Sequence, residues 1–126
     1  MFKLFIIGCG GFIGAVARYG LSGWVHRNNM SDFPYGTLTV NVIGCLLIGA
    51  LSYLVEDRIL LNPHMRAFLL IGILGAFTTF STFGYETVEL MGDGRMAAAL
   101  FNVLANVVIG LIAVWIGRTV LRVVHF

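Results

Sequence analysis

The chain has 126 residues, of which 59% are hydrophobic and only 11% are charged. Because soluble domains carry about 25% charged residues, too few polar side chains are present here to cover a water-facing surface. The composition therefore argues against a soluble domain and predicts an integral membrane protein, while the net charge of +2 gives no indication of nucleic-acid binding. A spanning helix takes about 20 apolar residues, so this length allows at most four spans with short loops.

Four apolar segments predict an all-α membrane protein with a single transmembrane domain over residues 1–126. The expected spans cover about residues 4–25, 36–55, 66–90 and 96–124. Polar links with turn-forming residues separate them, as is typical of short loops between helices. Four spans place both termini on the same side of the membrane.

The basic residues are nearly balanced between the two sides that this topology defines. The side of the termini receives Lys3, Arg58, Arg66, Arg118 and Arg122, and the other side receives Arg18, Arg27 and Arg95. An asymmetry of Lys and Arg normally fixes the orientation of a membrane protein. Two interpretations follow: the chain inserts both ways and pairs with an antiparallel copy, or a weak bias suffices to keep the termini in the cytoplasm.

The first span combines small residues with one arginine. Gly10, Gly14 and Ala15 have the spacing that lets two membrane helices approach closely. A charge within a span, such as Arg18, usually faces a cavity or a partner. Arg18 either extends to the membrane interface or lines an aqueous vestibule, where it would attract anions.

The second span carries Asn41 among apolar residues, with Thr37 on the same face one turn earlier. A side-chain amide offers two donors and one acceptor. Asn41 is therefore a candidate either for a hydrogen bond between helices, worth about 1 kcal/mol in membranes, or for a donor that lines an ion path.

The third span has the most informative sequence, because residues 72–83 mix glycines and hydroxyl residues with phenylalanines. Gly72, Gly75, Thr78 and Thr79 are poor helix formers. Non-helical backbone at membrane depth persists only where protein or a watery cavity satisfies its polar groups. We therefore expect the third helix to be broken in the middle of the membrane, with freed carbonyls that can bind a cation.

Aromatic rings and hydroxyls follow this expected break. Phe80 and Phe83 lie on one side of a helix, with Ser81 and Thr82 beside them. Packing is the usual role of phenylalanines at this spacing. Because the edge of an aromatic ring is partly positive, rings and hydroxyls together could also replace the hydration shell of a small anion.

The last span places Asn102, Asn106 and Gly110 on one face. This pattern fits a helix–helix contact, and it also fits a polar track for an ion. Glu86, one turn beyond Phe83, is either partly buried and paired or close to the interface.

Other chemistry is weakly represented in the sequence. Cys9 and Cys45 lie in apolar segments and are interpreted as buried small residues rather than a disulfide. We find no nucleophile–base pattern, phosphate-binding loop or zinc-protease motif. No catalytic residue is therefore predicted, and the chain is not expected to be an enzyme.

Three motifs resemble those of the small fluoride-channel family (Fluc, also called CrcB), and the similarity covers the whole chain. The motifs are Gly10-Gly11-x-x-Gly14-Ala15-x-x-Arg18-Tyr19, Gly36-Thr37-Leu38-x-Val40-Asn41-x-x-Gly44, and Gly72-x-x-Gly75-x-x-Thr78-Thr79-Phe80-Ser81-Thr82-Phe83 followed by Glu86. The resemblance implies a fluoride-selective channel of the cell (inner) membrane. Such a channel would export fluoride passively from the cytoplasm and protect against its toxicity.

The resemblance also implies an architecture and a set of site residues. Members are antiparallel, dual-topology homodimers in which two fluoride pores each take residues from both chains. The positions that match the fluoride pathway are Asn41, Phe80 and Phe83, with Ser81 and Thr82 near the helix break, Arg18 toward the vestibule, and Asn106 on the last span. A structural sodium ion, which is not transported, would be held at the dimer centre by backbone carbonyls of Gly75 and Thr78. Many members carry hydroxyl residues along the last span, where this chain has Gly110 and Val114.

Two other functions fit a small four-span protein. A proton-coupled multidrug exporter needs an acidic residue in its first span, and residues 1–25 contain none. A non-conducting assembly subunit would explain the small-residue faces, but it gives no role to Asn41, Phe80 or Phe83.

Overall fold

The computed structural model describes residues 1–56 and 61–124, and this part of the chain contains helices and no strand. The first two spans are single helices, α1 (Phe2–Asn28) and α2 (Tyr35–Glu56). The third span consists of α3 (Pro63–Arg66), the π-helical η1 (Ala67–Leu74), α4 (Gly75–Phe77) and α5 (Phe80–Gly92). The fourth consists of α6 (Met96–Leu104), the π-helical η2 (Ala105–Ile109) and α7 (Gly110–Val124).

These four segments are each long and apolar enough to cross a membrane. The expectation of an all-helical chain with four membrane-capable helices is thus confirmed. The first span continues past the expected residue 25 to Asn28, because the Asn28 and Asn29 side chains donate hydrogen bonds to the Trp24 and Val25 carbonyls at the helix end.

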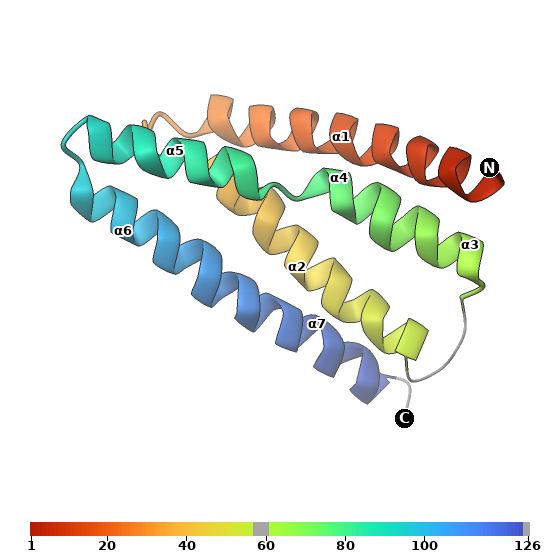
Figure 1. Ribbon diagram of the computed structural model, residues 1–126. Coiled ribbons are helices and arrows are strands. Elements are labelled where there is room, and N and C mark those ends of the chain that lie inside the picture. Colours follow the sequence, from red (N-terminus) through yellow and green to blue (C-terminus); the bar gives the residue numbers. More distant parts are fainter. Residues whose placement is uncertain (57–60, 125–126) are drawn as a thin grey trace.

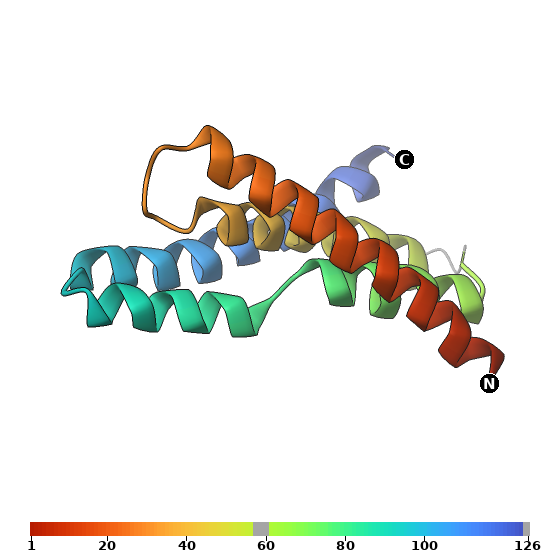
Figure 2. The same cartoon turned by 90° about the horizontal axis from the view of Figure 1, so that it is seen from above.

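The spans are arranged around α2, which packs against both α1 and α7. Figure 1 shows both termini at the same end of the molecule and the α5–α6 turn at the opposite end. Figure 2 shows α1 crossing over the third span, which it contacts along η1 and α4. The even number of spans brings Lys3, Arg66, Arg118 and Arg122 to the end of the termini, whereas Arg58 lies outside the described residues.

Glycines set the close helix contacts. A Cβ added at Gly14 would lie 2.9 Å from the carbonyl carbon of Ile73, and one at Gly10 would lie 2.6 Å from the Phe68 carbonyl oxygen. On the other side of the molecule, a Cβ at Gly49 would lie 2.9 Å from the Val114 backbone. These backbones touch only because no side chain separates them, as small residues allow in membrane helices.

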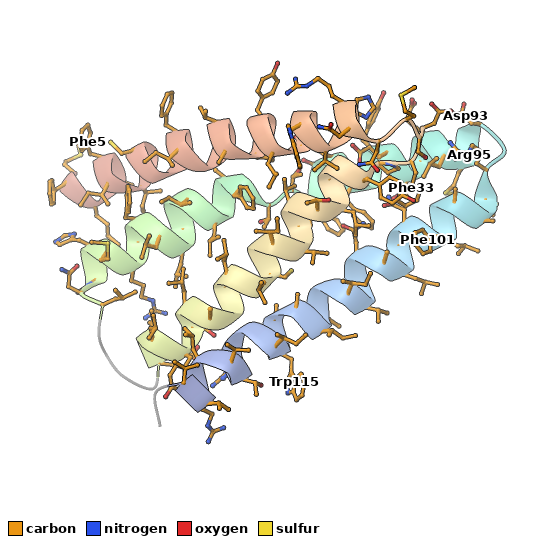
Figure 3. The ribbon with its side chains drawn as sticks, turned by 180° about the vertical axis from the view of Figure 1, so that it is seen from behind. Phe5, Phe33, Asp93, Arg95, Phe101 and Trp115 are labelled. Carbon is orange, nitrogen blue, oxygen red and sulfur yellow. The ribbon has the colours of Figure 1, made fainter. Side chains whose placement is uncertain are left out.

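A small aromatic core closes the end of the molecule near the α5–α6 turn. Phe33, from the loop between α1 and α2, packs with Leu90 of α5 and Ala99 of α6. Its ring centroid lies 5.3 Å from that of Phe101. Figure 3 shows these two rings near each other, on the side of the molecule that carries Asp93 and Arg95. This packing fixes the α5–α6 hairpin relative to α2.

Large apolar side chains cover much of the outer surface, including Phe12 on α1. Figure 3 shows two others, Phe5 on α1 and Trp115 on α7. Water would disfavour such a surface, whereas lipid tails are as apolar as the side chains themselves. The arrangement is that of a multi-pass membrane protein.

Candidate functional site

The helical backbone is interrupted between α4 and α5. Thr78 (φ −88°, ψ 156°) and Thr79 (φ −148°, ψ 117°) both have extended conformations. Thr79 is the N-cap of α5, because its Oγ1 accepts a hydrogen bond of 3.2 Å from the Thr82 N–H. The N–H groups of Thr79 and Thr82 therefore no longer reach the carbonyls of Gly75 and Thr78, which an uninterrupted helix would pair with them.

The Asn41 side chain of α2 binds this interruption at two points. Its Oδ1 accepts a 2.8 Å hydrogen bond from the Thr79 N–H, and its Nδ2 donates a 3.0 Å hydrogen bond to the Thr79 carbonyl. The second Nδ2 proton goes to Asn106 Oδ1 at 3.1 Å. Since Thr79 presents one donor and one acceptor of the main chain, only one orientation of the Asn41 amide satisfies both.

A glycine on α2 allows Thr78 to come this close. A Cβ at Gly44 would overlap the Thr78 Cγ2 methyl, and it would also lie 3.5 Å from the Phe77 ring. The Thr78 hydroxyl meanwhile donates to the Leu74 carbonyl at 3.1 Å, which satisfies the end of the widened η1 turn. Gly44 and Asn41 of α2 thus contact the two residues of this segment, Thr78 and Thr79 respectively.

A cavity of about 360 Å³ lies against this segment. It is lined by Asn41, Gly44, Cys45, Ile48, Leu70, Leu74, Gly75, Thr78, Thr79, Phe80, Phe83, Asn106 and Val107. We call it the break cavity. None of these lining residues carries a formal charge, so backbone and amide dipoles and ring edges provide its electrostatics. Gly75 and Phe80 are exposed, so this chain alone does not close the cavity.

The break cavity brings together most of the residues that the sequence singled out. Asn41 and Asn106 meet there by a direct hydrogen bond, although they are 65 positions apart in the chain. Gly75, Thr78, Phe80 and Phe83 come from the two sides of the interrupted helix and complete the set.

Three other residues assigned to the pathway are not among those that line this cavity. Ser81 and Thr82 are exposed in the first turn of α5, where their hydroxyls lie 3.4 Å and 3.0 Å from Thr79 Oγ1. They surround the N-cap rather than the cavity. Arg18 is half-buried on α1, and its carbonyl accepts a 2.6 Å hydrogen bond from Ser22.

The two phenylalanines differ sharply in exposure. Phe83 is buried, whereas the Phe80 side chain is 83% exposed at the rim of the cavity. Their ring centroids are 5.5 Å apart with an interplanar angle of 54°, so the rings are tilted rather than stacked. A tilted pair directs edges and faces to different sides, and an edge can meet an anion favourably.

Several contributors were missed by the sequence reasoning. Leu70, Leu74 and Val107 line the cavity from the π-helical turns of η1 and η2. Widened turns of this kind are frequent at functional sites, but no residue pattern in the sequence predicts them. Cys45 is half-buried in the same wall, and Cys9 lies exposed on α1 rather than buried; both are free thiols.

A second cavity, of about 350 Å³, lies near the α5–α6 turn. Glu86 lines it and accepts a 2.8 Å hydrogen bond from the Thr37 hydroxyl through Oε1. Its Oε2 is buried without a partner in the part of the chain that the structure describes. The acid is therefore partly buried and paired, which was one of the two alternatives open from the sequence.

Comparison with known proteins identifies relatives along nearly the whole chain. Residues 5–118 match the family described as "CrcB-like protein, Camphor Resistance (CrcB)". The chain is 45% identical to Fluoride-specific ion channel FluC 3 of Methanosarcina barkeri, over 95% of this chain and 90% of that protein. It is 43% identical to Fluoride-specific ion channel FluC of Geotalea daltonii, over 97% and 98%. A protein of the same name from Nitratidesulfovibrio vulgaris is 44% identical, over 93% and 94%.

Proposed function

Because the chain belongs to the CrcB family, we propose that it forms a fluoride-selective channel through which fluoride leaves the cytoplasm passively. The observation that carries this proposal is the break cavity, in which Asn41, Phe80, Phe83 and Asn106 converge on an interrupted membrane helix. The relatives are named as ion channels and not as enzymes, and the function proposed here involves no catalysis.

The chemistry of the cavity supports a small anion as its occupant. The N-terminal end of α5 faces the cavity through Thr79, Phe80 and Phe83. A helix N-terminus carries a partial positive charge, and its first N–H groups have no partner within the helix. The partly positive edges of the aromatic rings add to this positive potential. These groups would replace the hydration shell of a small anion, and the cavity would therefore favour small anions over larger ones.

We further propose that the channel is an antiparallel homodimer whose third span is discontinuous within the membrane. The open side of the cavity supports this arrangement, because the exposed Gly75 backbone, whose carbonyl has lost its helical partner, needs a protein cover at membrane depth. The near balance of Lys and Arg between the two ends supports insertion in both orientations. Each pore would then take residues from both chains.

The interrupted backbone also fits a sodium ion. The carbonyls of Gly75 and Thr78 have lost the N–H groups that would pair with them in a continuous helix. Hard cations prefer oxygen ligands, and unwound carbonyls bind sodium in other membrane proteins. One chain offers only part of a coordination shell, so the equivalent carbonyls of the second copy would complete it. The ion would hold the dimer together and would not be transported.

Replacing sodium by a large organic cation during purification is expected to lower the thermal stability of the dimer. An ion that binds only the folded form stabilises it by RT ln(1 + c/Kd) at a sodium concentration c, so removing sodium lowers the melting temperature. Thermal melting in detergent, followed by the loss of dimer on a sizing column, measures this effect. A melting temperature that does not change between sodium and the organic cation would exclude the structural ion.

Export can be tested in cells that lack their own fluoride exporter. We expect expression of this chain to raise the fluoride concentration that such cells tolerate in acidic medium, where fluoride enters as HF. Tolerance of chloride should not change. If the protein is present in the membrane and fluoride tolerance stays at the level of empty cells, the proposed export function is wrong.

A further inference from the structure

A series of side-chain hydrogen bonds starts at the N-cap of α5, beside the break cavity, and ends on α5 itself. It starts at the N–H of Thr79, passes through the side chains of Asn41, Asn106, Asn102 and Thr87, and ends at the carbonyl of Phe83. The donor–acceptor distances are 2.8, 3.1, 3.1, 2.9 and 2.7 Å in that order. This series, which we call the relay, passes through side chains of α2, η2, α6 and α5 and links the N-cap of α5 to Phe83 in its first turn.

Every bond in this relay has the same direction. The Thr79 N–H can only donate and the Phe83 carbonyl can only accept, so the two ends fix the polarity. Because the Thr87 hydroxyl gives its proton to Phe83, its oxygen is left to accept from Asn102. Hydrogen bonds aligned in one direction polarise and strengthen one another.

The four amide protons of the two cavity asparagines are all donated to hydrogen-bond partners, two within the relay and two to backbone carbonyls, so neither side chain can flip without losing a bond. Asn41 gives its two protons to the Thr79 carbonyl and to Asn106. Asn106 gives both of its protons to Asn102, one to the backbone carbonyl at 2.9 Å and one to Oδ1 at 3.1 Å. Asn106 Oδ1 therefore has to face Asn41, and Asn41 Oδ1 has to face the Thr79 N–H.

We propose that Asn102 and Thr87, which do not line the cavity, are positioning residues for conduction. Through the relay they set the orientation of the Asn41 amide and thereby hold Thr78 and Thr79 in the extended conformation. This inference rests on the proposed channel function. Asn102 is 1% exposed, so its amide has no water to replace a lost partner.

Two substitutions interrupt the relay at neighbouring links. Thr87→Val keeps the shape of the side chain and removes the hydroxyl, and Asn102→Leu removes the amide. Thr119→Val is the matched control, because the Thr119 hydroxyl also donates to the carbonyl four residues earlier, that of Trp115, but accepts no bond from an asparagine. The double variant Thr87→Val/Asn102→Leu tests whether the two residues act as one unit.

We expect each relay variant to slow fluoride efflux from liposomes about fivefold, the effect of one weakened hydrogen bond. The double variant should be no slower than the more severe single variant, because both substitutions break the same chain. Thr119→Val should conduct as the wild type does. Additive losses in the double variant would contradict a shared relay.

Hydrogen exchange of the Thr79 amide separates positioning from packing. In detergent-solubilised dimer, followed residue by residue by NMR, Thr79 should exchange about fivefold faster in Thr87→Val than in the wild type, while amides near the α5–α6 turn keep their rates. Unchanged Thr79 exchange in both single variants would overturn the relay. A wild-type protein that releases no fluoride would instead overturn the channel function and the conduction role with it, and the exchange of Thr79 would still decide the relay.

Discussion

Replacing Asn41 by aspartate is expected to slow fluoride efflux from liposomes about 100-fold, which corresponds to roughly 2.7 kcal/mol in the barrier. An ionised carboxylate has no proton for the Thr79 carbonyl or for Asn106, so two hydrogen bonds become contacts between acceptors. It also places a negative charge in the wall of a cavity that has no formal charge of its own. That charge repels an anion in the pore.

The control is Asn62→Asp, which adds the same charge outside the cavity. Asn62 caps α3 by accepting a 2.8 Å hydrogen bond from the Met65 N–H, and an aspartate keeps that bond. We expect this variant to conduct normally. If Asn41→Asp elutes as an intact dimer and still releases fluoride at the wild-type rate, Asn41 is not part of the conduction site.

A large loss of stability is expected from Gly14→Ala. The added methyl group would meet the Ile73 backbone, with its carbonyl carbon 2.9 Å away, and backbone atoms cannot rotate aside as a side chain can. α1 and η1 must therefore separate, and overpacking of this kind costs about 3 kcal/mol. Thermal unfolding in detergent measures the loss as a lower melting temperature.

Gly20→Ala is the matched control within the same helix. A Cβ at Gly20 has no atom of the described chain within 4 Å, so the change adds only helix propensity, worth up to about 1 kcal/mol in favour of alanine. Gly20→Ala should melt at or above the wild-type temperature. Equal melting of Gly14→Ala and the wild type would mean that the α1–η1 contact adapts more easily than its geometry indicates.

Residue chemistry alone predicts the four membrane-capable helices, and it predicts a weak point for helix formation at residues 75–79 of the third. Long apolar runs leave few alternatives to helices in a chain with so few charges. Gly75, Thr78 and Thr79 weaken helix formation at one point, and the extended conformations of Thr78 and Thr79 occur there. Local preferences of the backbone are readable from neighbouring residues, because they depend on neighbours alone.

The contacts that stabilise the extended segment at Thr78 and Thr79 could not be predicted from neighbouring residues, because they involve residues far apart in the sequence. Asn41 and Thr79 are 38 positions apart, and the sequence left Asn41 as a candidate for either a helix contact or an ion path. In the structure, Asn41 binds the Thr79 backbone and lines the break cavity. The sequence also grouped Asn102 with Asn106, but it gave no sign that Thr87 would join them.

Exposure was the other property that one sequence does not determine. Phe80 and Phe83 have the same chemistry and lie on one side of a helix, yet one is 83% exposed and the other is buried. The sequence likewise left Arg18 either at the membrane interface or in an aqueous vestibule, and the structure shows that it does not line the break cavity.

Ion efflux from liposomes that contain the purified wild-type protein tests the central claim most directly. Vesicles loaded with equal fluoride and chloride should release fluoride and retain chloride, each followed with its own ion-selective electrode. Selective release follows from a cavity in which ring edges and a helix N-terminus replace the hydration shell of a small anion. Release of both ions at the same rate, or release of neither, would contradict a fluoride channel.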